Sequence, residues 1–458
     1  MEFDLAKIHK VHFIGIGGIS MSALADILVS RGFFVSGSDA RESDATRKLE
    51  AEGVKIYIGQ RASNIAEDTD LVVYTAAIKD GDPELERARE LKVLLLTRAE
   101  FLGLLMKHYP VPVCISGTHG KTTTTSLISQ IFMDAGKDPT VMVGGIVPAI
   151  GGNLHKGSSE YFITEACEYT NSFLSFFPRI EVILNVKADH LDFFKDLDDI
   201  RNSFREYTRL LPDDGTLVIN GGIEDLSYFT EDLKCRVITF GLSEEFDYCA
   251  KNISYNDLAC GEYDLYKSGK YICRVYLSIT GQHNIINSLS TLAVADICGI
   301  DLKEACSSLT RFGGVDRRFE LLGKVGGVTV IDDYAHHPDE ITATLSAAAK
   351  YPHNKLFLVF QPHTYSRTKA LMDEFACALS AADVIVLADI YAAREKDDLG
   401  ISSQTLKEKI AELGKECYYF PTFDEIENFL LENCNPGDLL ITMGAGDVDI
   451  IGKKLLGK

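Results

Sequence analysis

The glycine- and threonine-rich segment GTHGKTTTT, at 117–125, carries the clearest chemical signal in the sequence. It follows a predicted strand and opens a predicted helix, the setting in which backbone amides hold phosphate groups. Lys121 would place a cation beside the β- and γ-phosphates of a nucleotide, and the Thr122 hydroxyl would bind Mg²⁺. Gly117 stands three residues before Gly120, which departs from the general pattern G-x-x-x-x-G-K-[ST]. We therefore expect an ATP site of a particular subclass.

A second glycine-rich segment, GIGGIS at 15–20, lies between another predicted strand and helix. Glycines at this position let backbone amides approach a pyrophosphate. The third glycine of the dinucleotide fingerprint is Ser20 here, which weakens an NAD-binding interpretation. Asp39 ends the next predicted strand and could bind a ribose, or could equally be a capping or solvated carboxylate. Two nucleotide loops on separate domains indicate an enzyme that couples an ATP-dependent step to a nucleotide-bearing substrate.

Two further segments, TEACEYTNSFL and NVKADHLDFF, each end a predicted strand. Glu165 and His190 would then emerge at the edge of the sheet where the phosphate loop opens, which makes them candidate metal ligands. Mg²⁺ prefers oxygen ligands, so the residue type alone argues only weakly for His190. Glu165 and Glu168 could also be exposed loop acids.

The elements that must position these residues alternate between strand and helix patterns, beginning with a strand at 11–18 and a helix at 20–31. The sequence predicts an α/β protein of three domains. We expect an N-terminal Rossmann-like domain over 1–108, a central P-loop ATPase-like domain over 109–322 and a C-terminal Rossmann-like domain over 323–458. The central sheet should be mainly parallel, with a small β-rich part at 235–280 whose segments RVITFG and YKSGKYICRVYLSIT suggest antiparallel hairpins.

Composition excludes several function classes. The 458 residues include 46 basic and 67 acidic side chains, a net charge of -21, which disfavours binding to nucleic acid or to anionic membranes. No apolar run reaches the roughly 18 residues of a membrane span, and the start lacks a signal-peptide pattern. The 11 cysteines show no C-x-x-C spacing, so reduced thiols are expected. These features predict a cytoplasmic protein without membrane insertion.

Motifs along nearly the whole chain closely resemble those of the Mur ligases, in the family's order. They are GIGGISMSALA, GSDA, GTHGKTTTT, TEACE with ADHLD, GQHNIINSLSTLAVA, GGVDRRFE, IDDYAHHP, VFQPHTYSRT and MGAGDVD. The resemblance implies an ATP-dependent amide ligase, and most narrowly the member that joins L-alanine to the carboxylate of UDP-N-acetylmuramate through an acyl phosphate in peptidoglycan precursor synthesis. It implies ATP and two Mg²⁺ ions, which Mn²⁺ could replace, only small-molecule substrates as partners, and a monomer or homodimer.

The resemblance also implies roles for individual residues. The ATP loop would comprise Gly117, Thr118, His119, Gly120, Lys121, Thr122 and Thr123. Thr122 would hold the first Mg²⁺, and Glu165 and His190 the second. The adenine side would be lined by His283, Asn284 and Asn287, with Arg318 and Asp332 near the phosphates and ribose. The wall of the amino-acid and γ-phosphate site would comprise His336, His337 and Arg367. The UDP-sugar would contact Gly15, Gly17, Gly18, Ser38 and Asp39.

The residues expected to carry the catalysis are Lys121, Glu165, His190, His337 and Arg367. His337 is a candidate base for the amine of the amino acid. One departure from the family pattern PHRYTRT is Thr364, where a basic residue is expected, so the L-alanine carboxylate would depend more heavily on Arg367.

Three other functions stay open at this point. A ligase of the same family could attach a preformed peptide instead of L-alanine. An NAD-dependent dehydrogenase could use GIGGIS and Asp39, although the ATP loop argues against it. A non-catalytic nucleotide-binding protein could share the fold, although retention of Lys121, Glu165 and His190 together makes that unfavourable.

Overall fold

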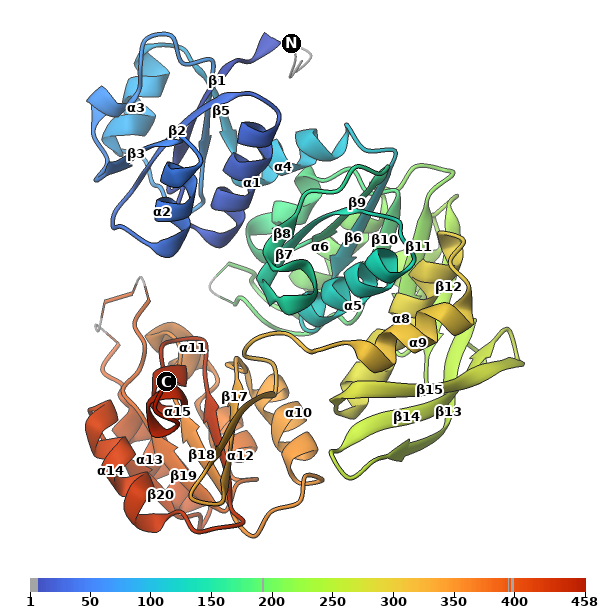
Figure 1. Cartoon of the computed structure of the whole chain (residues 1–458), viewed down its shortest axis with the longest axis vertical. Coiled ribbons are helices and arrows are strands. Elements are labelled where there is room, and N and C mark those ends of the chain that lie inside the picture. The colour runs from blue at the N-terminus through green and yellow to red at the C-terminus, as the bar shows by residue number, and fades with distance from the viewer. Residues whose placement is uncertain (1–6, 192, 394, 397–398) are drawn as a thin grey trace. The chain divides into compact units, whose positions relative to one another are not determined.

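The computed structural model describes residues 7–191, 193–393, 395–396 and 399–458. Strands and helices alternate along the chain (Figure 1), and the described strands form sheets of five, ten and six strands. Most strand pairs in these sheets are parallel and are linked by helices, so the predicted α/β fold class is confirmed. The chain divides into two compact units, residues 1–187 with 198–239 and residues 188–197 with 240–458. The boundaries predicted at 108 and 322 stay a prediction.

The N-terminal sheet is parallel throughout, with strand order β3-β2-β1-β4-β5. Because β2 and β4 flank β1, the strand order reverses beside β1, where open α/β sheets bind ligands. Its strands are β1 (Lys10–Ile14), β2 (Phe34–Asp39), β3 (Lys55–Ile58), β4 (Leu71–Tyr74) and β5 (Leu94–Thr97). Its helices are α1 (Ile19–Ser30), α2 (Asp44–Ala51), α3 (Pro83–Glu90) and α4 (Arg98–Met106).

The central sheet within the first unit has the order β11-β10-β6-β9-β7-β8, with only the edge strand β8 antiparallel to its neighbour. The carboxyl ends of β9, β6 and β10 therefore lie side by side. Its strands are β6 (Val111–Ser116), β7 (Thr140–Val147), β8 (Gly152–His155), β9 (Tyr161–Glu165), β10 (Ile180–Ile183) and β11 (Thr216–Asn220). Its helices are α5 (Lys121–Asp134), α6 (Leu197–Thr208) and α7 (Ser227–Thr230).

Glu181 is a carboxylic acid in the middle of this sheet. It lies on β10 opposite Cys114 of β6 and is fully buried. Neither of its carboxyl oxygens has a hydrogen-bond partner among the described residues. Burial raises the pKa of Glu181 well above its ordinary value, because a charged carboxylate without a partner is costly in an apolar interior. The folded protein therefore keeps a proton at Glu181 that the unfolded chain releases.

This buried acid predicts a pH-dependent stability. Because its pKa is raised on folding, its contribution is intact below the ordinary value of 4.5 and is lost as pH rises toward the folded-state pKa. The loss amounts to up to about 1.4 kcal/mol per pH unit. We expect Glu181→Gln to flatten the dependence of the denaturation midpoint on pH above the ordinary value of 4.5. The exposed Glu160→Gln is the matched control, and an unchanged pH profile in the Glu181 variant would contradict the assignment.

In the second unit the remaining strands of the ten-stranded sheet, of which the last three pair antiparallel, precede two helices. The chain enters this unit within β12 (Arg236–Gly241) and continues through β13 (Tyr248–Tyr255), β14 (Cys260–Lys267), β15 (Lys270–Thr280), α8 (Gln282–Ile297) and α9 (Leu302–Arg311). Ser268 and Gly269 both have positive φ, of 48° and 75°, as a two-residue hairpin requires, so the hairpin predicted around YKSGKY is confirmed.

The prediction that RVITFG forms a hairpin is wrong. This segment is β12, and its last two residues pair in parallel with the start of β13, through Phe240 with Tyr248 and Gly241 with Cys249. The connection SEEFD supplies no two-residue turn of positive φ that could fold the chain directly back.

The C-terminal sheet has the order β16-β17-β21-β18-β19-β20 and is parallel except for β16. Alternate residues pack on opposite faces, with Ile331 and Leu358 in one apolar cluster and Val330 and Val359 in the other. Its strands are β16 (Glu320–Val325), β17 (Val328–Asp333), β18 (Leu356–Phe360), β19 (Val384–Leu387), β20 (Cys417–Tyr419) and β21 (Leu439–Met443). Its helices are α10 (Pro338–Ala348), α11 (Tyr365–Ala370), α12 (Met372–Leu379), α13 (Ser403–Glu412), α14 (Phe423–Asn433) and α15 (Asp449–Leu455).

Among the residues that the structure describes, no helix has the length and apolar character needed to cross a membrane.

Candidate active site

The segment after β6 folds as a phosphate loop in the first unit. Gly117 and Gly120 adopt positive φ values of 134° and 89°, which favour glycine. A Cβ on Gly117 would also lie 3.0 Å from the Leu184 side chain and 3.1 Å from the Asn185 amide. Helix α5 begins at Lys121 directly after Gly120. The amides of its first turn therefore lack intrahelical acceptors and are available to an anion at the loop.

Asn185 holds this loop in place, although the sequence analysis did not select it. Its side chain accepts from the His119 amide and donates to the His119 carbonyl, both at 2.9 Å. The Asn185 carbonyl accepts from the Thr118 amide, and the Thr118 hydroxyl accepts from the Lys187 amide. Asn185 follows the carboxyl end of β10, which neighbours β6 in the sheet. The position of Asn185 at the end of a predicted strand is the feature of the sequence that marks it as a candidate site residue.

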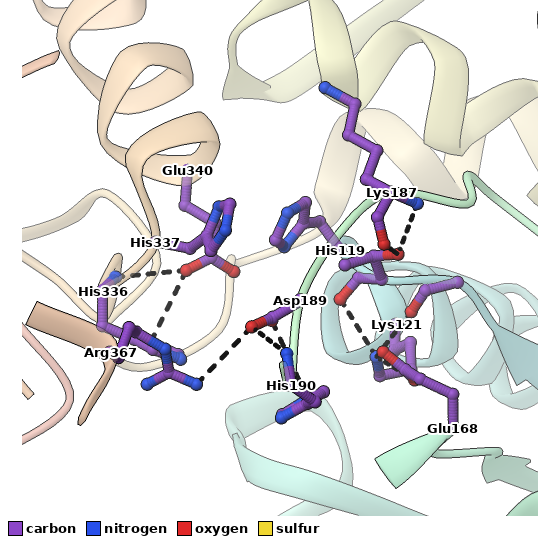
Figure 2. A network of polar contacts seen from close by, with 12 residues as sticks. His119, Lys121, Glu168, Lys187, Asp189, His190, His336, His337, Glu340 and Arg367 are labelled. Atoms are coloured by element: carbon purple, nitrogen blue, oxygen red, sulfur yellow. Dashed lines mark hydrogen bonds and ion pairs between the residues drawn. The ribbon is translucent and has the colours of Figure 1, made fainter. Parts of the chain in front are cut away.

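Lys121 is held by a buried acid. Its ammonium group donates to the Glu168 carboxylate at 2.9 Å, to the Thr118 carbonyl at 3.0 Å and to the Gly117 carbonyl (Figure 2). Glu168 is 2% exposed, so it is not an exposed loop acid. Burial acts to lower the pKa of Lys121, but the Glu168 carboxylate outweighs it and the pKa is raised. A cation is therefore fixed within the loop at neutral pH.

Glu165 ends β9, the other neighbour of β6. One carboxylate oxygen accepts from the Gly144 amide at 2.6 Å. Thr122 and Thr123 are partly exposed in the first turn of α5. The Thr122 hydroxyl and the Glu165 carboxylate are the oxygen donors that Mg²⁺ prefers, so the donor set in this unit fits that ion.

His190 and Arg367 belong to the second unit. The Asp189 carboxylate accepts from the His190 amide at 2.7 Å and lies 3.7 Å from the Arg367 guanidinium (Figure 2). Burial acts to raise the pKa of Asp189, but His190 and Arg367 outweigh it and the pKa is lowered. His190 has a positive φ of 53°, an uncommon conformation for a histidine. Because Glu165 and His190 lie in separate units, their joint role as metal ligands stays a prediction.

A cluster of basic side chains follows β17 and β18 in the same unit. The Arg367 guanidinium lies 3.4 Å from the His363 ring, and the His363 and His336 rings have centroids 5.8 Å apart. Burial lowers the pKa of His336, and burial with the neighbouring His336 and Arg367 lowers that of His363 to about 4. Both imidazoles are therefore neutral at neutral pH, and Arg367 carries the fixed charge. His363 is not among the residues predicted from the sequence.

Glu340 is the counter-charge of this cluster. It accepts from the His336 amide at 3.1 Å and lies 3.9 Å from the Arg318 guanidinium. His337 is 6% exposed and caps α10, since its Nδ1 accepts from the Asp339 amide at 3.3 Å. A neutral imidazole that accepts at Nδ1 carries its proton on Nε2. In this conformation His337 is therefore suited to donate a hydrogen bond rather than to accept a proton.

Asp332 is fully buried rather than open to a nucleotide. Its two oxygens accept from Arg317 at 3.0 Å and from Thr442 at 2.6 Å. Arg317 also donates to the Gly444 and Gly446 carbonyls, at 2.7 and 2.9 Å. Arg317 thus pairs with the Asp332 carboxylate. The sequence predicts that this carboxylate lies near the phosphates and ribose of ATP, together with Arg318. The structure indicates that Asp332 orders the carboxyl end of β21.

The adenine-side candidates gather at the start of α8. Asn284 and Asn287 are both buried, and the Asn287 amide donates to the Asn284 side-chain oxygen at 3.1 Å. Asn284 also donates to the Thr280 carbonyl at 2.7 Å, while His283 in the same turn is exposed.

Thr364 adopts φ 69° and ψ 144° before α11, a strained conformation for a β-branched residue.

The backbone amides of the glycine loop at 15–18 already donate hydrogen bonds within the N-terminal domain. Gly15 and Ile16 donate to the Ser38 carbonyl at 2.8 and 2.9 Å, Gly17 to the Asp39 carboxylate at 2.8 Å, and Gly18 to the Gly15 carbonyl at 3.3 Å. The Ser38 side chain is buried and donates to Glu84 at 2.5 Å. The donors without an intrahelical acceptor are therefore in the first turn of α1, which begins at Ile19 directly after the predicted glycines.

The three sheets correspond to three matched segments. Residues 10–110 match the Mur ligase family catalytic domain, residues 115–295 the Mur ligase middle domain, and residues 317–446 the Mur ligase glutamate ligase domain. The chain belongs to the Mur ligase family. Mur ligases depend on ATP, which agrees with the phosphate loop.

Relatives within the Mur ligases match over their full length. The UDP-N-acetylmuramate-L-alanine ligase of Lachnospira eligens is 56% identical, with 99% of each chain covered. That of Agathobacter rectalis is 54% identical, with 100% of each chain covered. The structure of UDP-N-acetylmuramate-alanine ligase from Thermotoga maritima has a TM-score of 0.82 at 31% identity and 98% coverage of both chains. A murein peptide ligase from Psychrobacter arcticus has a TM-score of 0.72 at 25% identity and the same coverage.

Proposed function

We propose that this protein is an ATP-dependent ligase that joins L-alanine to the carboxylate of UDP-N-acetylmuramate, releasing ADP and phosphate, in peptidoglycan precursor synthesis. The observation that carries the proposal is the phosphate loop built around the charged, largely buried Lys121, because it fits transfer of a γ-phosphoryl group. The choice of substrates is supported by relatives of 50–56% identity that are named UDP-N-acetylmuramate-L-alanine ligase.

In the proposed reaction the muramyl carboxylate attacks the γ-phosphorus of ATP, and ADP leaves. The loop amides and the first turn of α5 bind the triphosphate, while Lys121 neutralises charge on the transferred group. The acyl phosphate then has a good leaving group, which the free carboxylate lacks. The neutral amine of L-alanine attacks the acyl carbon. The tetrahedral intermediate then loses a proton from the nitrogen to a base or to solvent, and phosphate departs to leave the amide.

Thr122 would hold the first Mg²⁺ ion in the first unit. A bound divalent ion neutralises negative charge on the phosphates. A second ion on Glu165 and His190, and replacement of Mg²⁺ by Mn²⁺, are further parts of the proposal.

Arg367 would bind the carboxylate of L-alanine. It is the cation that remains charged beside the neutral His336 and His363, and a guanidinium can bind a carboxylate through two hydrogen bonds. The pyrophosphate of the UDP-sugar would bind at the first turn of α1. We expect a monomer or homodimer that works in the cytoplasm, where ATP and nucleotide sugars are available.

The test is phosphate release with Mg-ATP and UDP-N-acetylmuramate, with L-alanine, glycine, L-serine or a short peptide as the amine. We expect release that depends on both the UDP-sugar and L-alanine, with the amide product identified by mass. Turnover with the peptide but with none of the three amino acids would instead assign the ligase that attaches a preformed peptide. The absence of turnover with every amine would contradict a ligase function.

A further inference from the structure

Two cysteine side chains of the second unit meet outside the sites described above. Cys273 lies on β15 and Cys306 on α9, and their sulfur atoms are 3.0 Å apart. Both cysteines are free thiols. Cys273 is partly exposed, whereas Cys306 is 6% exposed. Cys273 is therefore the more accessible residue of the pair, and the Cys306 sulfur lies in contact with its sulfur.

The elements that carry the two thiols are fixed to each other by hydrogen bonds. The Ser278 hydroxyl of β15 donates to the Leu309 carbonyl at 3.3 Å and to the Phe312 carbonyl. The Thr310 hydroxyl of α9 donates to the Tyr276 carbonyl at 3.0 Å. These bonds hold the thiols together without help from a covalent link, which raises their effective concentration toward each other.

The two thiols also differ in acidity. The contact with Cys306 and the nearby Lys303 lower the pKa of Cys273. The contact with Cys273 and burial raise the pKa of Cys306. The exposed member of the pair is thus the one with more thiolate character, as a thiol that attacks a disulfide requires.

We propose that Cys273 and Cys306 form a reversible thiol-disulfide site, in which Cys273 is the attacking thiol and Cys306 the resolving thiol. The oxidant is a small disulfide such as oxidised glutathione. The Cys273 thiolate attacks one sulfur of the oxidant and releases one glutathione thiolate, which leaves a mixed disulfide. The Cys306 thiol then passes its proton to the released glutathione thiolate, and its sulfur attacks the Cys273 sulfur and releases the second glutathione, so two protein thiols are oxidised and one glutathione disulfide is reduced.

The product would join β15 to α9 covalently. Thr280, the last residue of β15, accepts from Asn284 in the first turn of α8 at 2.7 Å. The link would therefore restrain the strand that leads into the predicted adenine-side residues. Because intracellular thiols are kept reduced, the pair is expected to be a dithiol until an oxidant appears.

The experiment treats the full-length protein with oxidised glutathione and maps the products by mass spectrometry of alkylated, digested protein. The wild type should yield a peptide pair joined through Cys273 and Cys306, 2 Da lighter than the two free peptides, with no glutathione retained at Cys273. Cys306→Ser should instead accumulate glutathione at Cys273. Cys273→Ser should leave Cys306 largely unmodified, and Cys377→Ser, which alters an exposed cysteine elsewhere, should behave as the wild type.

Retention of glutathione at Cys273 in the wild type would overturn the resolving role of Cys306. Oxidation confined to other cysteines such as Cys377 would overturn the site itself. Circular dichroism spectra of the serine variants verify that they fold. A third variant, Lys303→Gln, keeps both thiols and is expected to slow alkylation of Cys273 at neutral pH, and an unchanged rate would contradict the proposed thiolate character.

Discussion

Replacing Lys121 with Ala is expected to lower ATP-dependent phosphate release by about 10³-fold. The ammonium group lies between two loop carbonyls and Glu168, so a bound γ-phosphate meets a cation that is already positioned. Removing it leaves charge uncompensated on the transferred phosphoryl group. The measurement is the initial rate of phosphate release at saturating UDP-N-acetylmuramate and L-alanine.

Two companion variants separate charge from folding. Lys107→Ala removes an exposed lysine of the same unit and is expected to turn over normally. Lys121→Arg keeps a cation but not its compact geometry, so we expect intermediate activity. Near-normal turnover of Lys121→Ala, in a variant with an unchanged denaturation midpoint, would refute the assignment of the loop to ATP.

Replacing Glu165 with Gln is expected to lower the rate by about 10²-fold and to raise the Mg²⁺ concentration needed for half-maximal rate. Glutamine can still accept the hydrogen bond from the Gly144 amide, so the local fold should persist while the charge that attracts a divalent ion is lost. The measurement is the rate as a function of Mg²⁺ concentration.

The control for this variant is Glu160→Gln, which removes an exposed carboxylate just before β9. It should leave the Mg²⁺ dependence as in the wild type. If Glu165→Gln lowered the maximal rate without any change in the Mg²⁺ dependence, Glu165 would act on the substrate rather than through a metal.

Much of the fold follows from the local sequence. Buried parallel strands such as LFLVF at 356–360 are continuous apolar runs, and the glycines of GTHGK mark the turn into α5. The pairing of distant strands is harder to predict from the local sequence. The β16–β17 hairpin turns through Gly326 and Gly327, with φ 57° and 83°, and the sequence analysis interpreted that segment only as the start of a new domain.

The site residues divide in the same way. Lys121 and Gly117 could be predicted because the loop's requirements are local. Glu168 and Asn185 are harder to predict, because their roles depend on strands β9 and β10 lying on either side of β6, and the sequence signals only that Asn185 lies at the end of a predicted strand. Asp332 is a similar case: the sequence shows no partner for this carboxylate, and the structure supplies Arg317, while its place near a nucleotide stays a prediction.

The pairing of Lys121 with Glu168 has a consequence for the end of the catalytic cycle. An unpaired lysine in a ring of amides would hold any small anion, and free phosphate or sulfate would compete with ATP. Glu168 acts as an internal competitor for the same ammonium group, so a weakly bound anion cannot displace it, whereas the many contacts of a triphosphate can. The same competition favours departure of the products, because the carboxylate regains the lysine as soon as the phosphoryl group has moved. We therefore expect Glu168 to lower the affinity of the loop for small anions and for the products.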